Sequence, residues 1–502
     1  MELNNVYMGK ILIVDLDAGS CQEEELEEEA VEERLGGIGI NLALYRRFQE
    51  REPIIIGTGL LTGTFAPASS AGAITAQSPR SGRVCHTPLM WQTAAELKYS
   101  GYDFVAILGT SAKPVRIWLH DEIAELADAS AFWGKDVWET TDGLRLEHGD
   151  DYVQVLTIGP AGERGHEIAH VSENYWGSRD IAGLGALFGR KRLKALAMRG
   201  LGSLGVAEGF FDACAQLRER IRASHMGAPP RGLLRILEAL GADKGAVERL
   251  SAHVHRSEAS FNGIYPFNSF VAIDQDPRRL EEFESQEPGV LLTDVAAAAS
   301  LLCLGDPMAV AAAARRALRL GLDPLACGGI LARVGVTDRR QAEDHLDRIA
   351  DKGATLAGEG VGHVYGVARW PLSDAPEVRL IETLGTLCHS VPPTPVFFGY
   401  ETCGVSTDPV ERARWWALLE AGALIMGICP LSVMLTPELS LASMAHLGAL
   451  ASGLEGLDAG RLEEEARRCL SESQELSTPV ARMPDAWEAE GFTEALKAII
   501  NG

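Results

Sequence analysis

The chain has 502 residues, too many for one hydrophobic core, since single cores stop growing near about 250–300 residues. Acidic residues outnumber basic ones by 70 to 46, which gives a formal net charge of −24. A surface of that sign repels phosphate backbones and anionic lipid heads, so we expect no nucleic-acid partner and no membrane partner.

The amino terminus has no basic segment followed by an apolar run, and no stretch of about 18 uninterrupted apolar residues occurs in the sequence. The nine cysteines are widely spaced and form no C-x-x-C pair. This spacing is typical neither of a disulfide framework nor of a local metal knuckle. We therefore expect a cytoplasmic protein.

The first two hundred residues are expected to be rich in strands. Apolar and β-branched runs between Gly, Pro and Asp turns predict strands in 10–16, 53–59, 72–78, 103–109, 115–120, 152–159 and 193–200. One helix is expected in 28–50, broken by Gly36, Gly37 and Gly39. The acidic run at 23–33 is interpreted as a solvated face.

After residue 203 the pattern becomes helical. Apolar residues recur at intervals of three and four residues in 210–223, 232–240, 293–304, 307–322, 339–356, 411–428 and 459–476. The change of pattern separates a β-rich amino-terminal part from a helical remainder.

One motif is typical of a metal site. His166, Glu167 and His170 spell H-E-x-x-H, which on a helix places two imidazoles on one face for zinc. However, Pro160, Gly162 and Gly165 disfavour a helix of that length, and we predict a strand over 166–172. On a strand the two histidines are about 13 Å apart, too far for one ion, so we expect no zinc.

Seven segments of the first 203 residues, in order and spacing, resemble the aldehyde ferredoxin oxidoreductase family of tungsten- or molybdenum-pterin enzymes. They are "GKILIVDLDAG", "GGIGINLALY", "IIIGTGLLTGTFAPASSAGAITAQSPRSG", "KYSGYDFVAILGTSAKPVRIWL", "WGKDVWETTDGLR", "VLTIGPAGE" and "AGLGALFGRKRLKALAMRG". The resemblance implies an α+β protein with a β-rich pterin-binding domain in 1–203 and helical domains in 204–380 and 381–502. It also implies oxidation of an aldehyde to a carboxylate, with electrons passing through a four-iron cluster to ferredoxin.

The resemblance assigns candidate site residues, each with a simpler structural explanation. Two Gly-rich turns would meet the pterin, although such turns also simply satisfy backbone geometry. Asp323 would lie near the pterin but also suits a helix N-cap before Pro324. His389 would be catalytic, or a half-buried core histidine, and Cys429 would be the last cluster ligand, or a small core residue. The turn residues are Ser78, Pro79 and Gly82 in the first turn and Ala182, Gly183 and Gly185 in the second.

The chain departs from the family at several positions. The family's C-x-x-C-x-x-x-C motif is missing from 268–290, and Cys429 alone cannot hold a four-iron cluster, which needs about four thiolates. Arginines expected in two Gly-rich segments are replaced by Ile38 and Ile181, although Arg83 and Arg179 are close in sequence. Ile offers phosphate no hydrogen bond, so we expect weaker pterin binding at these segments than in the family. Further departures are Cys85, Pro88, Met90, Thr293 beside Asp294, and Leu424.

Two functions of different class fit these features. The residues alone support a catalytic and a non-catalytic protein nearly equally. The first is a pterin-dependent oxidoreductase of small aldehydes or related oxo groups, without a normal resident cluster. The second is a non-catalytic paralogue that serves as scaffold or regulatory subunit. Either would work as a homo- or hetero-oligomer, with a ferredoxin-like protein or a complete family homologue as partner.

Overall fold

The computed structural model describes residues 6–80, 82–178, 180–223, 244–245, 248, 254–256, 269–271, 304, 306–353, 363–364, 367–368 and 409–477. The chain divides into two compact units. Unit 1 comprises Met1–Gly109, Gly200–Ser224 and Asp374–Gly502, and unit 2 comprises Thr110–Arg199 and His225–Ser373. The division of the chain after residue 203 into 204–380 and 381–502 stays a prediction.

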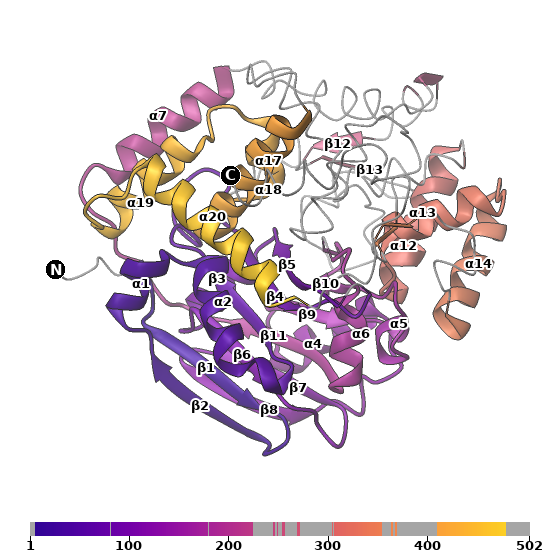
Figure 1. The fold of residues 1–502 in the computed structure, drawn as a ribbon. Coiled ribbons are helices and arrows are strands. Elements are labelled where there is room, and N and C mark those ends of the chain that lie inside the picture. Colours follow the sequence, from indigo (N-terminus) through magenta and orange to yellow (C-terminus); the bar gives the residue numbers. More distant parts are fainter. Residues whose placement is uncertain are drawn as a thin grey trace. The chain divides into compact units, whose positions relative to one another are not determined.

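Unit 1 is built on a six-stranded mixed sheet with the order β2-β1-β6-β3-β4-β5 (Figure 1). The strands are β1 (Lys10–Asp15), β2 (Ser20–Glu25), β3 (Ile54–Thr58), β4 (Gly72–Gln77), β5 (Val84–Leu89) and β6 (Phe104–Leu108). β1 and β6 are parallel, and the other pairs are antiparallel. The central strands β3 and β6 are apolar runs buried along their whole length, which places the core of this unit at the middle of the sheet.

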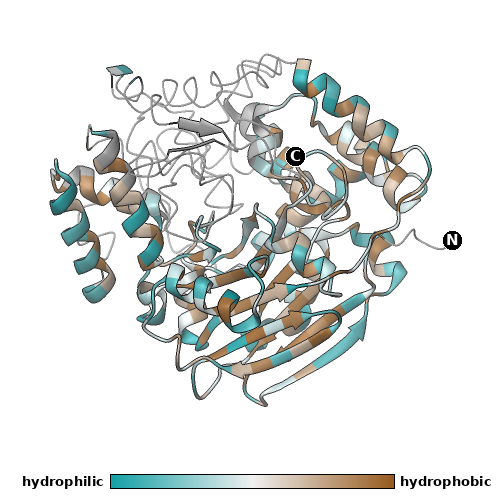
Figure 2. Cartoon of the chain, turned by 180° about the vertical axis from the view of Figure 1, so that it is seen from behind, coloured by the Kyte–Doolittle hydropathy of each residue, from teal (hydrophilic) through white to brown (hydrophobic). Residues whose placement is uncertain are grey.

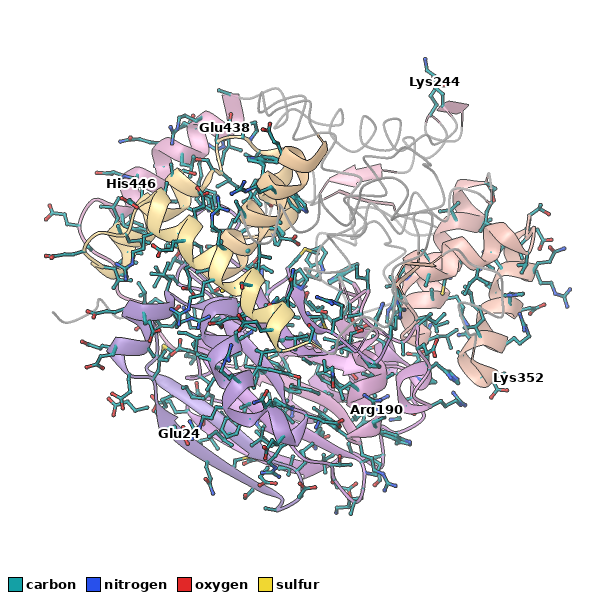
Figure 3. The ribbon with its side chains drawn as sticks, viewed as in Figure 1. Glu24, Arg190, Lys244, Lys352, Glu438 and His446 are labelled. Atoms are coloured by element: carbon teal, nitrogen blue, oxygen red, sulfur yellow. The ribbon has the colours of Figure 1, made fainter. Side chains whose placement is uncertain are left out.

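The edge strand β2 carries much of the acidic run, and its carboxylates are exposed or half-buried. Glu24 lies on this strand and pairs with Arg47 (Figure 3). The prediction of a solvated face is therefore confirmed, although part of the run is a strand. Charged side chains on an edge strand also oppose pairing with another sheet edge.

Unit 1 also contains helices, some of which pack on the sheet. They are α1 (Glu28–Arg34), α2 (Gly37–Phe48), α3 (Thr93–Tyr99), α7 (Phe210–Ala223), α17 (Pro409–Met426), α18 (Pro430–Leu435), α19 (Leu441–Ser452) and α20 (Ala459–Glu475), with a short 3₁₀ turn, η1 (Gln49–Arg51). α2 packs on β3 and β4 and also contacts α17 and α20. The helix predicted over 28–50 breaks at Leu35 and Gly36, and a Cβ on Gly37 would lie 1.9 Å from the carbonyl oxygen of Leu424. Glycine is needed there because two backbones meet.

Unit 2 is built on a five-stranded sheet with the order β10-β9-β11-β7-β8. Its strands are β7 (Val115–His120), β8 (Ile123–Asp128), β9 (Gln154–Ile158), β10 (Val171–Glu173) and β11 (Leu193–Arg199). Two short antiparallel pairs also belong to this unit: β12 (Val254–Arg256) with β13 (Ser269–Val271), and β14 (His363–Val364) with β15 (Val367–Ala368).

The helices of unit 2 are α4 (Val137–His148), α5 (Pro160–Glu163), α6 (Leu184–Arg190), α12 (Pro307–Leu320), α13 (Pro324–Arg333) and α14 (Arg339–Lys352). α4 begins at a capping box in which Asp136 and Glu139 each accept from a backbone N–H of the other. Asp136 also pairs with Arg319 at 2.6 Å, which ties α4 to α12. The strands are largely hydrophobic, whereas α14 is mostly hydrophilic (Figure 2).

The predicted α+β class is confirmed, and so are the seven strands predicted from apolar runs before residue 203. The helices predicted in 210–223, 307–322, 339–356, 411–428 and 459–476 are confirmed as well, while those in 232–240 and 293–304 lie largely outside the described residues. Among the described residues, no helix is long and apolar enough to cross a membrane.

The strand predicted over 166–172 is wrong. Only Val171–Glu173 is a strand, and 166–170 is a turn with one isolated bridge between Ala169 and Leu322. The backbone there bonds to the end of α12, since the N–H of His170 donates to the carbonyl of Gly321 at 2.9 Å. Contacts with a segment about 150 residues later thus replace a local strand partner.

Candidate functional site

The first Gly-rich turn connects β4 to β5 in unit 1, and its backbone is closed on itself. The N–H of Ser78 donates to the carbonyl of Arg83 at 2.7 Å, and the N–H of Gly82 donates to the carbonyl of Ser78 at 2.9 Å. The N–H of Arg80 donates to Oγ of Ser78 at 3.2 Å. Gly82 has φ +70°, the left-handed region that suits glycine. These backbone donors are therefore already committed within the turn.

What the first turn offers a ligand is positive charge. Arg83 is 6% exposed and Arg80 is half-buried. A guanidinium can make paired, charge-assisted hydrogen bonds to phosphate. The turn thus suits an anionic group through its side chains and not through its N–H groups.

The strand that follows the first turn is fully buried beneath α20. His86 lies between two hydroxyls, with Nδ1 2.8 Å from Oγ1 of Thr75 and Nε2 2.8 Å from Oγ of Ser473. Since Ser473 donates to the carbonyl of Cys469, its oxygen accepts from His86, so Nε2 carries the proton. Asn41 in turn donates to Thr75, whose hydroxyl donates to Nδ1. Burial lowers the pKa of His86 to about 3, which keeps the ring neutral.

The second Gly-rich turn precedes α6 in unit 2 and converges on one carboxylate. Oδ2 of Asp180 accepts from the N–H groups of Val171 and Gly185, each at 3.1 Å. Oδ1 of Asp180 accepts from the N–H of Ala182 at 3.1 Å. Gly183 has φ +80° and forms the N-cap of α6. Two of the three predicted residues of this turn therefore donate to the protein itself.

Glycine at 185 is required for packing. A Cβ there would lie 2.6 Å from the backbone carbon and oxygen of His170. Ile181, at the expected position of an arginine, is 8% exposed, and Ile38 in unit 1 is 1% exposed. Neither isoleucine gives a phosphate group a donor.

Asp323 lies at the start of α13 in unit 2, as its N-cap interpretation implies. Its N–H donates to the carbonyl of Ile168 at 2.7 Å, and its carbonyl accepts from Cys327 at 3.0 Å. The side chain is 3% exposed. The segment 166–170 thus connects the second turn with the start of α13.

The two histidines of the H-E-x-x-H motif have different partners. Nε2 of His166 is 3.1 Å from the carbonyl of Ala350 on α14, and Nε2 of His170 is 2.7 Å from Oγ of Ser172. Among the residues that the structure describes, no group of three or more His, Cys, Asp or Glu side chains is placed to hold a metal ion.

Cys429 is the N-cap residue of α18 in unit 1 and is 9% exposed. Its N–H donates at 2.8 Å to the carbonyl of Ala68, which has φ +63°. The loop 59–71 also bonds to the end of α17, where Leu61 donates to Met426 at 2.7 Å. The loop therefore fixes the cysteine's backbone, as a core position or a former ligand position would need.

Several predicted positions lie outside the described residues: Arg179, His389, Thr293 with Asp294, and the 268–290 region, of which only 269–271 is described. Two residues of these sites were missed in the sequence. Asp180 carries a usable signal, because Asp before a glycine turn commonly binds the backbone two residues later. His86 carries none, since a lone histidine in an apolar strand has no local pattern.

The fit of a pterin phosphate differs between the two turns. The first turn fits, because the side chains of Arg83 and Arg80 supply positive charge there although the backbone N–H groups are bonded within the turn. The second turn does not fit, because the N–H groups of Ala182 and Gly185 are bonded to the carboxylate of Asp180.

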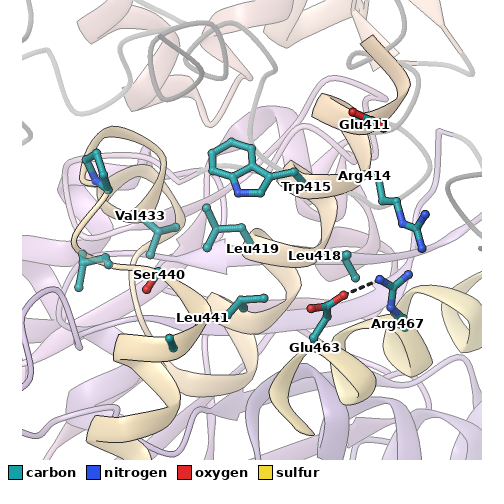
Figure 4. Close-up of a pocket in the computed structure, with 13 residues that line it drawn as sticks. Glu411, Arg414, Trp415, Leu418, Leu419, Val433, Ser440, Leu441, Glu463 and Arg467 are labelled. Carbon is teal, nitrogen blue, oxygen red and sulfur yellow. Dashed lines mark hydrogen bonds and ion pairs between the residues drawn. The ribbon is translucent and has the colours of Figure 1, made fainter. Parts of the chain in front are cut away.

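A separate cavity of about 610 Å³ lies within unit 1 between α17, the segment before α19, and α20. Its floor is apolar, with Trp415, Leu419 and Leu441, and Glu463 pairs with Arg467 at its rim (Figure 4). The size suits a small apolar ligand with a polar end. The described lining residues include none of the predicted site residues.

Comparison with known proteins gives similarities for part of the chain and for its fold. Residues 11–200 match the profile of the aldehyde ferredoxin oxidoreductase N-terminal domain. A tungsten-containing aldehyde ferredoxin oxidoreductase of Pyrococcus abyssi is 39% identical over 210 residues, which cover 40% of this chain and 35% of that protein. The aliphatic sulfonate oxidoreductase, WOR-like subunit, of Pyrococcus furiosus is 28% identical over 221 residues, 39% of this chain and 35% of that one.

A solved structure extends the likeness of fold. The active-site complex BamBC of benzoyl coenzyme A reductase, in complex with 1,5-dienoyl-CoA, superposes with a TM-score of 0.76 at 18% identity. The superposition covers 99% of this chain and 94% of that one. The chain therefore resembles that structure in fold, whereas its sequence matches about a third of the length of the relatives.

Proposed function

The chain belongs, through residues 11–200, to the aldehyde ferredoxin oxidoreductase family, and on that premise we propose that it oxidises aldehydes or related oxo groups to carboxylates. One observation carries the proposal. The matched segment runs without interruption from β1 to β11, so it includes both sheets and both Gly-rich turns.

The first turn supports pterin binding. When bound, a tungsten- or molybdenum-pterin supplies the two-electron oxidation. Arg83 binds the phosphate end of that group, with Ser78 and Gly82 shaping the turn around it. By the family resemblance Asp323 is a further candidate for the pterin, and His389 holds or moves the substrate's proton.

Electron exit differs from the family in this proposal. The full sequence holds no C-x-x-C pair, so Cys429 has no ligand set of the family kind around it. Electrons therefore pass to a ferredoxin-like partner's own cluster. A homologue named as a WOR-like subunit and a neighbour named as a complex support assembly with other subunits. The wide spacing of the nine cysteines suits a reducing cytoplasm, where we propose the protein works.

The test is aldehyde-dependent reduction of a viologen dye, with metal analysis, on protein purified without oxygen from a host that makes the cofactor. We expect bound tungsten or molybdenum and dye reduction. Arg83→Ala should lower cofactor affinity about tenfold or more, because a charged hydrogen bond contributes about 1.5–3 kcal/mol. The matched control is Arg47→Ala, whose arginine pairs with Glu24 on the exposed edge strand. No metal in wild-type protein would exclude the oxidoreductase.

The non-catalytic scaffold is the second candidate, and the closed second turn favours it. Asp180 occupies donors that a phosphate would need, and Ile38 and Ile181 replace arginines. This candidate predicts metal-free protein that copurifies with a complete family member. Full dye reduction by the isolated chain would exclude it.

A further inference from the structure

The second turn surrounds the buried carboxylate of Asp180 with backbone donors. Asp180 is 2% exposed and accepts from the N–H groups of Val171, Ala182 and Gly185, each at 3.1 Å. Backbone N–H groups that converge on one point form an anion-binding concavity. Here that concavity already contains an anion of the chain.

The backbone of the turn holds this carboxylate in place. The N–H of Asp180 donates to Oγ of Ser178 at 3.1 Å, and that hydroxyl donates to the carbonyl of Val171. Gly185 is fixed from the other side by its close approach to the backbone of His170. Both the backbone of Asp180 and the N–H donor at Gly185 are therefore held in place.

We propose that Asp180 is the turn's own anion and closes the second Gly-rich turn to phosphate. A phosphate could enter only by expelling a buried carboxylate, and two negative groups at the same N–H cluster would repel each other. Resting on the proposed function, this means that the cofactor is held at the first turn alone. The chain then takes one pterin where the resemblance implies two.

The test uses inorganic phosphate as the probe and hydrogen exchange as the readout, so it does not depend on activity. Asp180→Ala should free the three N–H groups, and phosphate should then slow exchange in 171–185 and raise Tm more than chloride does at equal ionic strength. In wild-type protein phosphate should leave exchange in 171–185 unchanged. Asp180→Ser, which keeps a short turn-forming hydroxyl, is the second variant if Asp180→Ala fails to fold. Phosphate should slow its exchange in 171–185 in the same way.

The matched control is Asp338→Ala. Asp338 also accepts a backbone N–H, from Gln341 at 3.0 Å, but it caps α14 in solvent. Phosphate should not alter its local exchange. No phosphate effect on 171–185 in either Asp180 variant would overturn the proposal, and so would equal slowing in wild-type protein. Absence of pterin from wild-type protein would defeat the proposed function and leave this result unaffected.

Discussion

The two turns each contain a glycine with a positive φ, and they differ in charge. In the first turn the backbone donors bond to backbone carbonyls and a serine hydroxyl, and the charged side chains are those of Arg80 and Arg83. In the second turn the backbone donors converge on Asp180. Glycines therefore mark a tight turn in both places, whereas the neighbouring charged side chain decides whether an anion can bind.

The largest expected effect concerns the backbone packing of the second turn. Gly185→Ala should lower the free energy of unfolding by about 3 kcal/mol, because its Cβ would meet the backbone of His170 at 2.6 Å. Urea unfolding measures the loss. Gly165→Ala is the matched control, since Gly165 has φ +73° with open space around it, and should lose only about 1–2 kcal/mol. Equal losses would show that the close approach is unimportant.

The strand beside the first turn should respond to pH through His86. Its pKa is lowered to about 3, so below about pH 6.5 the unfolded chain binds a proton that the folded ring refuses. Stability is fully present above that pH and should fall by about 2 kcal/mol between pH 6.5 and 5 from this group. His86→Gln should remove that part of the slope in denaturant titrations. An unchanged slope would contradict the neutral, buried ring.

The smallest expected effect concerns the end of α20 over the same strand. Oγ of Ser477 accepts from the buried N–H of Val84 at 2.9 Å. Ser477→Ala should therefore lower the free energy of unfolding by about 1 kcal/mol, as expected for one lost hydrogen bond. Ser443→Ala, whose hydroxyl bonds within the partly exposed start of α19, is the comparison in the same urea experiment. A cost at Ser477 no larger than at Ser443 would mean that the hydrogen bond from Val84 to Ser477 adds nothing to the stability of α20 over β5.

Sequence patterns predicted the strands that are apolar throughout, such as β3 and β6, because continuous burial leaves a local pattern. The strands they missed include β2, β5 and β8. β2 is an acidic edge strand with no apolar face, and β5 contains His86 and Pro88, whose burial depends on α20, almost four hundred residues later. The false strand at 166–170 has the same cause, since Gly321 and Asp323 supply its partners.

The positions of the two turns could be predicted from the sequence, whereas the bonding of their backbone donors could not. The family resemblance located Gly82, Arg83, Gly183 and Gly185 at the two turns, and the structure contains both turns. The role of Asp180 depends on a bond to Val171, nine residues earlier, which only the folded turn brings within reach. For that reason the glycine pattern of the second turn did not predict that its N–H groups bind a carboxylate.

The ratio of pterin to tungsten or molybdenum tests the central asymmetry most directly. It should be measured on protein purified without oxygen from a host that makes the cofactor. One pterin per metal is predicted, because the N–H groups of the second turn are bonded to Asp180, whereas the first turn brings the cations Arg80 and Arg83. Two pterins per metal would contradict the closed second turn, and no pterin at all would contradict cofactor binding at the first.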